Sequence, residues 1–460
     1  MSDRLDLLAR FPWLKAALKS RLWQPAAMLL TLSFFVLAIL TGLFGTPAGS
    51  RNFGIIFVWI VWWALLIVAL VPFFGRLWCA VCPIPAPGEW LQRRGIVRRV
   101  PGRLHSLGWR WPKRFRNIWL QNAGFLLVAL FSAVILTRPT VSGWVLLGFV
   151  LLGVLLSLLY ANRVFCRYVC PVGGFIGLYS LAAPLELRVK DAAVCQAHQS
   201  KDCVVGTAGS YGCPWLVYPG TLRRNAHCGL CGECLRACPK DNLALNLRPF
   251  GSDLLVAQER RLDEAYKALI MLACALVYSA VLLGPWGWVK DLANMKTLDG
   301  WALYAASFLA VNLLVLPGLF WLATALARRL GGLATPLRRL FVDYAYGLAP
   351  LGLAGWIAFS LSFVFVNGSY ALSVLSDPFG WGWDLLGTAH FPWQPILPEF
   401  VPALQVAVLL LGLAFSITVI YRIARQLSPA AMMGRVWRGT LPVAGFMMGI
   451  TLLFLRLYLG

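Results

Sequence analysis

Four cysteines in one short stretch of the sequence have the spacing of iron–sulfur ligands. Cys228, Cys231 and Cys234 are each three residues apart, and Cys238 follows four residues later, directly before a proline. In this C-x2-C-x2-C-x3-C-P run the first three thiolates hold one cluster, and the fourth reaches a neighbouring cluster. A zinc site and four idle thiols are the alternatives, but zinc sites favour two C-x2-C pairs with a longer spacer between them. The spacing therefore predicts an iron–sulfur cluster.

Three further cysteines precede this run and supply additional ligands. Cys195, Cys203 and Cys213, the last of which also precedes a proline, are interpreted as an irregular first motif with an insertion. Paired motifs of this kind exchange their last ligands between two clusters. We therefore predict two ligand sets, which are Cys213, Cys228, Cys231 and Cys234 for one cluster and Cys195, Cys203 and Cys238 for the other.

The second set contains only three cysteines, so its fourth ligand is open. Either this site holds a [3Fe-4S] centre, or it holds a [4Fe-4S] centre with one ligand that is not cysteine. His198, three residues after Cys195, is the candidate, because histidine replaces cysteine in some iron–sulfur centres. A solvated loop histidine is the alternative interpretation of the same residue.

Two more cysteine motifs lie at the ends of apolar stretches and repeat one another. The first reads R-L-W-C-x2-C-P and contains Cys79 and Cys82, and the second reads R-V-F-C-x3-C-P and contains Cys166 and Cys170. An internal repeat of this kind indicates a duplicated pair of spans. Each copy brings two thiols to the same membrane face, and together they are enough for a third cluster. Reduced cysteines that only pack and a thiol relay without a cluster are the alternatives.

The segments that must position these cysteines are apolar helices. Of the 460 residues, 60% are hydrophobic and only 13% are charged, whereas about a quarter of the residues of a soluble protein are charged. The composition predicts an α-helical integral membrane protein, and the cysteine motifs predict that a small ferredoxin-like iron–sulfur module is inserted into it. Hydropathy predicts about nine transmembrane helices, at 25–45, 54–74, 118–136, 142–161, 267–286, 300–323, 344–366, 401–420 and 439–457.

The distribution of basic residues sets the expected orientation in the membrane. The formal net charge is +23, and with the N-terminus inside, most of the 41 Lys and Arg residues fall in inner connections. This asymmetry follows the positive-inside rule, so it indicates membrane topology and no nucleic-acid binding. We expect a multi-pass protein of the bacterial inner membrane whose N-terminus and iron–sulfur module face the cytoplasm. The basic face would attract anionic membrane lipid and an acidic redox partner.

The predicted domain organisation follows from the spans and the cysteines. The iron–sulfur module can be short because metal centres contribute to the folding of such domains. A short strand within 240–251 is expected to close it. The four predicted parts are a cytoplasmic interfacial segment at 1–24, a four-span N-terminal bundle with both Cys-Pro helix ends at 25–185, the module at 186–265 and a C-terminal bundle of about five spans at 266–460.

In these motifs the sequence resembles the membrane polyferredoxins of the NosR/NapH/CcoG type. The resemblance rests on Cys166-x3-Cys170-Pro171 and on the run from Cys228 to Pro239, and it covers about 54–250. It implies electron transfer at a membrane, often with quinol or with a periplasmic reductase system. The sequence departs from the pattern in its C-x2-C-P first helix end, its irregular first ferredoxin motif and its missing outer flavin-binding domain. The resemblance also leaves the C-terminal spans unexplained.

Two functions compete on this basis. The first is a redox conduit between a soluble cytoplasmic carrier of the ferredoxin or flavodoxin type and the quinone pool or a membrane redox complex. The second is a redox-active assembly or maturation factor for a metalloenzyme. A transporter with a regulatory cluster ranks third, because the spans lack the acidic pairs that ion pathways use. The expected cofactors are two module clusters, a third cluster at the helix ends and a quinone, and no catalytic residue is assigned.

Overall fold

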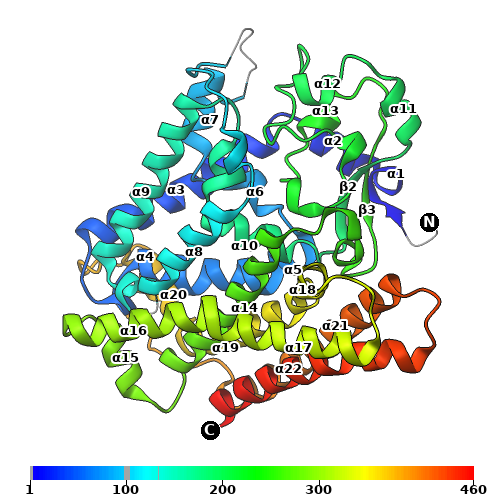
Figure 1. The fold of residues 1–460 in the computed structure, drawn as a ribbon. Helices are drawn as coiled ribbons and strands as arrows, with labels where there is room; N and C mark the ends of the chain where they lie inside the picture. The colour runs from blue at the N-terminus through cyan, green and yellow to red at the C-terminus, as the bar shows by residue number, and fades with distance from the viewer. Residues whose placement is uncertain (1–3, 98–103, 133) are drawn as a thin grey trace. The chain divides into compact units, whose positions relative to one another are not determined.

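The chain divides into two compact units, each assembled from segments that are distant in sequence (Figure 1). The computed structural model describes residues 4–97, 104–132 and 134–460. Every cysteine except Cys274 belongs to the first unit. Unit 1 comprises Met1–Ile39, Ala69–Gln121 and Trp144–Asp253, and unit 2 comprises Leu40–Val68, Asn122–Gly143 and Leu254–Gly460.

Eight helices within the described ranges are long and apolar enough to cross a membrane. A helix needs about 20 predominantly apolar residues for this purpose, and many of the large hydrophobic side chains on these helices are exposed. The finding supports the prediction of a multi-pass membrane protein. The eight helices are Trp23–Phe44, Phe53–Phe74, Pro139–Leu159, Leu262–Leu282, Leu298–Gly331, Leu337–Asn367, Pro398–Leu427 and Met433–Leu459.

The ninth predicted span, at 118–136, is not confirmed as a helix of spanning length. Its counterpart is α8 (Trp119–Ser132), an apolar helix of 14 residues. At 1.5 Å per residue such a helix is about 21 Å long, whereas the hydrocarbon core is about 30 Å thick. Residue 133 of the predicted span lies outside the described residues, and a short 3-10 turn follows at Ile135–Thr137.

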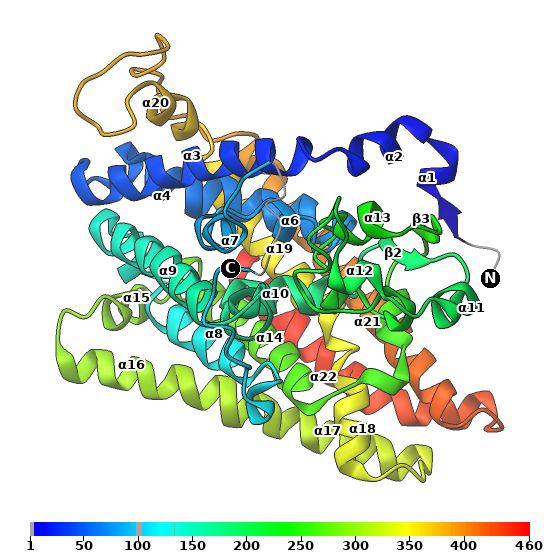
Figure 2. The same cartoon turned by 90° about the horizontal axis from the view of Figure 1, so that it is seen from above.

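Unit 1 contains a small antiparallel sheet that underlies the predicted iron–sulfur module (Figures 1 and 2). Its strands are β1 (Leu5–Asp6), β2 (Leu185–Val189) and β3 (Leu243–Leu247), and β3 is the central strand. The strand expected within 240–251 is thus confirmed as β3. Strand β1 was not expected, because it is only two residues long and lies far from its partner in sequence.

Short helices and leucines complete this part of unit 1. Leu187 on β2 faces Leu245 on β3, and both belong to a buried cluster with Leu8, Leu230 and Leu235. The burial of these apolar side chains holds the N-terminal segment on the module. The helices around the sheet are α1 (Leu7–Arg10), α2 (Pro12–Lys19), α11 (Ala192–Ala197), α12 (Asp202–Val205) and α13 (Glu233–Ala237).

Longer helices of unit 1 lead to the two Cys-Pro motifs. Proline cannot continue a preceding helix but fits the first position of a new one, so each motif marks a helix boundary. Helix α10, for example, begins at Pro171. The elements concerned are the unit 1 parts of α3 (Trp23–Phe44) and α9 (Pro139–Leu159), together with α5 (Val71–Phe74), α6 (Trp78–Val81), α7 (Ala86–Arg93) and α10 (Pro171–Tyr179).

Unit 2 is a helical bundle with an aromatic centre. Trp356 is 1% exposed, and its ring packs against Trp63, Phe125 and Tyr278. The main elements of unit 2 are α4 (Phe53–Ile55), the π-helical segments Ile56–Trp62 and Leu65–Leu70, α14 (Leu262–Leu282), α15 (Gly287–Ala293), α16 (Leu298–Ala310), the π-helical segment Val311–Val315, α17 (Leu316–Gly331), α18 (Leu337–Ala345), α19 (Leu348–Asn367), α20 (Tyr370–Ser376), α21 (Val401–Leu427) and α22 (Met433–Leu459).

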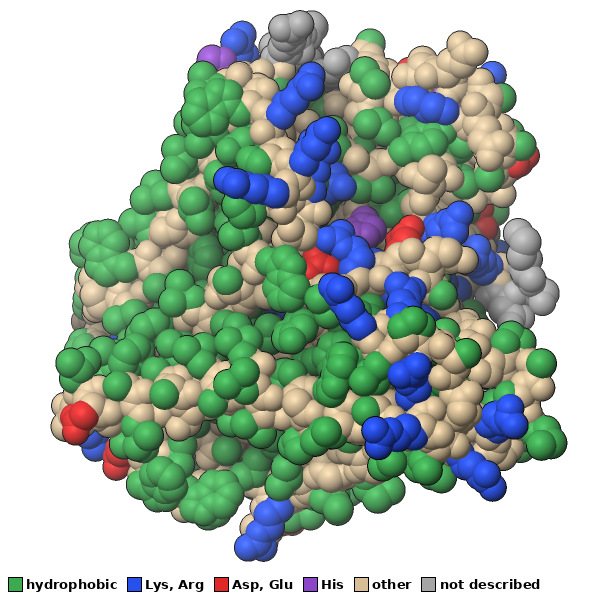
Figure 3. Space-filling model, in the orientation of Figure 1, with side chains coloured by type: hydrophobic (Ala, Val, Ile, Leu, Met, Phe, Trp, Pro, Cys, Tyr) green, Lys and Arg blue, Asp and Glu red, His purple; other side chains and the backbone are tan. Residues whose placement is uncertain are grey.

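The surface has the composition that a lipid-embedded protein requires. On the face drawn in Figure 3, hydrophobic side chains cover much of the area, and Lys and Arg far outnumber Asp and Glu. A soluble monomer rarely exposes large contiguous apolar patches, so this surface agrees with the eight spanning helices.

Candidate iron–sulfur sites

The four cysteines of the two Cys-Pro motifs come together in unit 1, and we call them the helix-end group. Burial and, to a smaller extent, the charges of other members raise the pKa of Cys82, Cys166 and Cys170, in the last case to about 11. Cys79 contributes to all three, so the four thiols are close neighbours. Each motif copy therefore supplies two of them, as the internal repeat predicts.

A π-turn accounts for the unequal spacing of the two copies. Residues Phe165–Val169 form a π-helical segment, and the backbone N–H of Cys170 donates to the carbonyl of Phe165 at 2.8 Å. A π-turn contains one residue more than an α-turn, so it accommodates the C-x3-C spacing where the first copy has C-x2-C. Cys170 then caps α10, because its sulfur accepts a hydrogen bond from the N–H of Gly173 at 3.2 Å.

Buried polar side chains hold the backbone of both motifs. Gln24 on α3 donates to the carbonyl of Ala80 at 2.9 Å, and Gln121 on α8 donates to the carbonyl of Cys166 at 3.2 Å. Both amides are almost completely buried. An unpaired buried amide is costly, so these bonds tie the positions of the cysteines to the neighbouring helices.

Two arginines occupy equivalent positions in the motif copies, three residues before the first cysteine. Arg163 donates to Glu89 at 3.0 Å and to the carbonyl of Cys79 at 2.5 Å. Burial opposes ionisation of Glu89, but the charges of Arg163 and Arg93 outweigh it and lower the pKa of that carboxyl. Arg76 is also buried, at 5% exposure, but no acid pairs with it in the described residues.

Cys213, Cys228, Cys231 and Cys234 line one cavity, and we call them the module group. Burial raises the pKa of Cys228 and Cys231 to about 11, while the backbone N–H groups of Leu230 and Glu233 donate to these sulfurs and lower it. Such donors stabilise thiolates. The grouping matches the ligand set that the sequence predicts for the first cluster, and its role as a ligand set stays a prediction.

The tight turn between these cysteines depends on unusual backbone angles. Leu230 and Gly232 adopt left-handed conformations, with φ of 52° and 75°. Gly229 lies flat against Trp215, since a Cβ at this position would be 2.4 Å from the indole Nε1. Glycine at 229 is therefore required by close approach, and at 232 by φ.

Cys195, Cys203 and Cys238 form a third, more exposed group, which we call the outer group. Asn242 joins two of its members: its side-chain amide donates to Cys195 Sγ at 3.3 Å, and its backbone N–H donates to Cys238 Sγ at 3.4 Å. Burial raises the pKa of Cys203, and the charges of Cys195 and Cys238 add to the effect. The outer group adjoins the module group, because the charge of Cys203 also raises the pKa of Cys234.

His198, the candidate fourth ligand of the outer group, makes local contacts. Its Nε2 lies 2.9 Å from the Ser200 hydroxyl and 3.5 Å from a carboxylate oxygen of Asp202. The structure thus brings the three outer cysteines together and gives His198 two other partners. Its role as a ligand stays a prediction.

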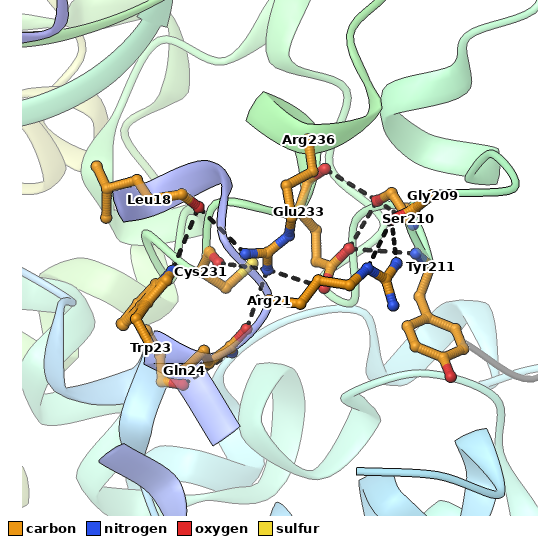
Figure 4. A network of polar contacts seen from close by, with 12 residues as sticks. Leu18, Arg21, Trp23, Gln24, Gly209, Ser210, Tyr211, Cys231, Glu233 and Arg236 are labelled. Atoms are coloured by element: carbon orange, nitrogen blue, oxygen red, sulfur yellow. Dashed lines mark hydrogen bonds and ion pairs between the residues drawn. The ribbon is translucent and has the colours of Figure 1, made fainter. Parts of the chain in front are cut away.

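A polar network fixes the module group against the start of the first span (Figure 4). Arg236 on α13 donates to the carbonyls of Leu18 at 3.2 Å and Cys231 at 3.3 Å, and to Glu233 at 3.0 Å. Glu233 also accepts from the Ser210 hydroxyl at 2.6 Å. Burial raises the pKa of Glu233, but Arg236, Arg93 and the Ser210 hydroxyl together outweigh this effect and lower it. The network therefore consists of ionised partners in a buried position, which makes it geometrically specific.

The residues present fit iron–sulfur groups. Arg76 Nε, Arg76 Nη2 and Trp215 Nε1 are buried N–H donors that have no hydrogen-bond acceptor in the described part of the chain. Such donors normally have a partner, and hydrogen bonds to cluster sulfurs are a known means of setting potential. No three Cys, His, Asp or Glu side chains within the described ranges converge closely enough to hold a single metal ion; the module thiols instead surround a shared cavity.

Comparison with known families supports cluster binding. A model of the Fer4_5 family, described as a 4Fe-4S binding domain, matches residues 55–103 and 142–186. These segments contain the two Cys-Pro motifs with all four helix-end cysteines. No curated protein and no solved structure matches the chain. The match and the eight apolar helices together fit a 4Fe-4S-binding membrane protein, and the narrower NosR/NapH/CcoG type stays a prediction.

Sequence reasoning missed several residues that shape these sites. Asn242 carries no motif signal, because its contact with Cys195 depends on the pairing of distant segments. The roles of Gln24 and Gln121 had a weak signal, since amides inside apolar stretches are seldom placed there without a partner. Arg76 had the clearest signal, because the repeat shows an arginine three residues before the first cysteine of each copy.

Proposed function

We propose that this protein transfers electrons at a membrane, between a soluble carrier and the quinone pool or a membrane redox complex. Bound iron–sulfur clusters would supply one-electron chemistry near the thiol groups. The observation that carries the proposal is the succession of three thiol groups within one compact unit. The outer group is the most exposed, the module group adjoins it, and the helix-end group lies at the ends of spanning elements.

The residues around the thiols suit such a role. Of the helix-end cysteines, Cys79, Cys166 and Cys170 are each below 10% exposure, and Cys82 is partly buried. Burial excludes water from these sites, and backbone N–H groups offset the cost of thiolate charge. Only the outer group combines three half-buried cysteines, so it is the natural point of exchange with a soluble partner of the ferredoxin or flavodoxin type.

The proximity of the helix-end thiols also bears on membrane topology. Cys82 and Cys166 belong to one group, so the chain between them must cross the membrane an even number of times. Pro139–Leu159 is the one helix of spanning length between them in the described ranges. We infer that α8 makes the second crossing, because a short apolar segment is accommodated by local thinning of the bilayer. Nine crossings and a cytoplasmic module then follow from the positive-inside rule.

Cysteine substitutions test the proposed function directly. The purified, anaerobic protein is expected to contain iron and acid-labile sulfide and to show reducible EPR signals. Cys166→Ser should remove one signal and Cys231→Ser another, whereas Cys274→Ser in unit 2 should remove none. An iron-free wild-type protein would refute the proposal, as would the same iron content and spectra in all four proteins.

A second experiment tests the quinone link. In membrane vesicles, added quinone should reoxidise the reduced clusters, which is followed by their EPR signals. The rate of this reoxidation should depend on the presence of the full-length protein. Signals that ignore quinone but disappear when an oxidised copper or iron client protein is added would favour a maturation factor instead.

A further inference from the structure

Arg76 is a buried cation with an unusual set of neighbours. Its guanidinium lies over the ring of Trp215, with 4.4 Å from Cζ to the ring centroid, and Nη1 donates to the carbonyl of Ala226. Two glycines of α10 lie against it: a Cβ at Gly177 would be only 3.1 Å from Nη1, so this glycine makes room for the side chain, and a Cβ at Gly173 would be in ordinary contact, 3.5 Å from Nη2. The site is therefore shaped to hold this side chain.

These neighbours place the guanidinium between two of the thiol groups. On one side, Gly173 is the residue whose N–H donates to Cys170 Sγ of the helix-end group. On the other side, Trp215 lines the module cavity, and Ala226 lies two residues before Cys228. In agreement with this position, the charge of Arg76 lowers the pKa of both Cys170 and Cys228, although burial raises it more.

Arg76 differs from the equivalent arginine of the second motif copy. Arg163 has an acidic partner in Glu89, which it shares with Arg93. Arg76 has no acidic partner in the described ranges, and its Nε and Nη2 atoms have no acceptor there. A cation that is 5% exposed and lacks a counterion is costly to bury, so the missing negative charge is expected from a bound group.

We propose that Arg76 is a shared charge-setting residue, whose guanidinium raises the reduction potentials of the clusters at both the helix-end and the module group. The proposal rests on the proposed function, since it presupposes clusters at both sites. Reduction adds one electron and no proton to an iron–sulfur group, so the reduced form carries one more negative charge. A buried cation nearby stabilises that form, and net charge and hydrogen bonds are known determinants of the potential.

The test is an EPR-monitored redox titration of the anaerobic, full-length protein with dithionite as reductant. Two substitutions separate charge from packing. Arg76→Gln removes the charge but can still donate to the Ala226 carbonyl, and Arg76→Lys retains the charge. Arg114→Met removes an exposed arginine of unit 1 and controls for total charge. The two signals are assigned beforehand as those lost in Cys166→Ser and in Cys231→Ser.

In Arg76→Gln we expect full iron content and lower midpoint potentials for both signals. The expected fall is at least tenfold in each reduction equilibrium constant, which is about 59 mV for a one-electron couple. Arg76→Lys should shift both by less than half as much, and Arg114→Met should shift neither. The proposal is overturned if Arg76→Gln retains its iron and only one signal moves, or if neither does.

Folding problems do not prevent a decision. Should Arg76→Gln lose its iron, Arg76→Lys decides alone: at full iron content, a fall of more than tenfold in either equilibrium constant contradicts the proposal. A wild-type protein without iron would refute the proposed function itself. If the wild-type protein shows both signals but the variants have unchanged midpoint potentials, only the role of Arg76 is refuted.

Discussion

At the scale of single residues, hydrogen bonds from nearby backbone N–H groups favour the negatively charged form of the cysteine sulfurs. The N–H groups of Ile84, Leu230 and Glu233 each lie two residues after a cysteine and donate to its sulfur. Burial nevertheless keeps the pKa of these thiols above that of free cysteine. Iron must therefore displace protons when it binds, and metal binding to deprotonated ligands is coupled to folding for this reason.

Asn242 provides a test of how hydrogen bonds affect the outer group. Its side-chain amide is the donor to Cys195 Sγ, and an N–H···S bond stabilises the reduced, more negative state. In Asn242→Ala we expect the potential of the outer-group signal to fall by about 20 to 60 mV, which corresponds to about 0.5–1.5 kcal/mol for one hydrogen bond.

The matched control for this prediction is Asn246→Ala on β3, the strand that Asn242 directly precedes. Asn246 is also buried, but its side chain donates to Glu186. It should leave the outer-group potential unchanged. Equal shifts in the two variants would show that strand stability, and not the bond to sulfur, is responsible.

The residue scale also shows what the sequence could predict. Ligand spacing within one turn is fixed by covalent geometry, so the proximity of Cys228, Cys231 and Cys234 could be expected before any fold was known. The contacts of Arg76 and Asn242 depend on the packing of distant segments, and no local pattern specifies them. The repeat marked Arg76 as special without indicating which of the two arginines would lack a counterion.

At the scale of elements, the N-terminal segment is a structural part of the module. Leu8 is 3% exposed and lies in the same cluster as Leu235 and Leu245. Leu8→Ala should destabilise the docked segment by about 2–5 kcal/mol, the usual cost of truncating a buried leucine. Limited proteolysis of the segment around Leu8, and the rate at which the EPR signals decay on warming, should both increase.

Leu5→Ala is the matched comparison for this variant. Leu5 is 53% exposed, so its truncation should change the proteolysis rate little. Equal sensitivity of the two variants would contradict a role for the leucine cluster in holding the segment.

Ion pairs to Asp241 reinforce the same contact. Asp241 accepts hydrogen bonds from Lys15 and Lys19, which lower its pKa to about 2. A lowered pKa means that the stabilisation is complete above the unfolded value of about 3.9 and is lost only as the pH falls through about 2. Because the pair is well solvated, its contribution should be under about 1 kcal/mol.

Hydrogen exchange can measure this contribution. Asp241→Asn retains a residue that tolerates the left-handed φ of 49°, and it should lower the protection of 12–19 slightly and equally at pH 6 and pH 8. Asp299→Asn, in an exposed position of unit 2, should not affect these amides. A loss of protection that differs between the two pH values would contradict the assignment.

At the scale of the whole molecule, hydropathy located the spans well because lipid exposure requires long apolar stretches. It was less informative for α8, a largely apolar helix of 14 residues that is compatible with either a short crossing or a buried helix. It also gave no indication that the compact units would be built from interleaved segments. The division into units depends on which helices pack together, and the apolar composition of the helices does not specify their packing partners.

The inferred crossing by α8 has a measurable consequence for the chain termini. Nine crossings place the two termini on opposite sides of the membrane, whereas eight place them on the same side. We expect an epitope fused after Gly460 to be cleaved by protease added outside spheroplasts, and an epitope before Met1 to be protected. Protection of both epitopes would mean that α8 does not cross.

The pairing of β1 with β3 has a consequence for the order of events during synthesis. Leu5 and Asp6 leave the ribosome first, yet their partners at Leu247 and Asn246 are translated only after the spans up to Leu159. The first strand must therefore wait, unpaired, while these helices insert. Completion of the sheet, and with it the docking of the N-terminal segment on the cysteine-bearing module, can only follow the synthesis of these spans, so a finished module has a natural earliest moment in translation.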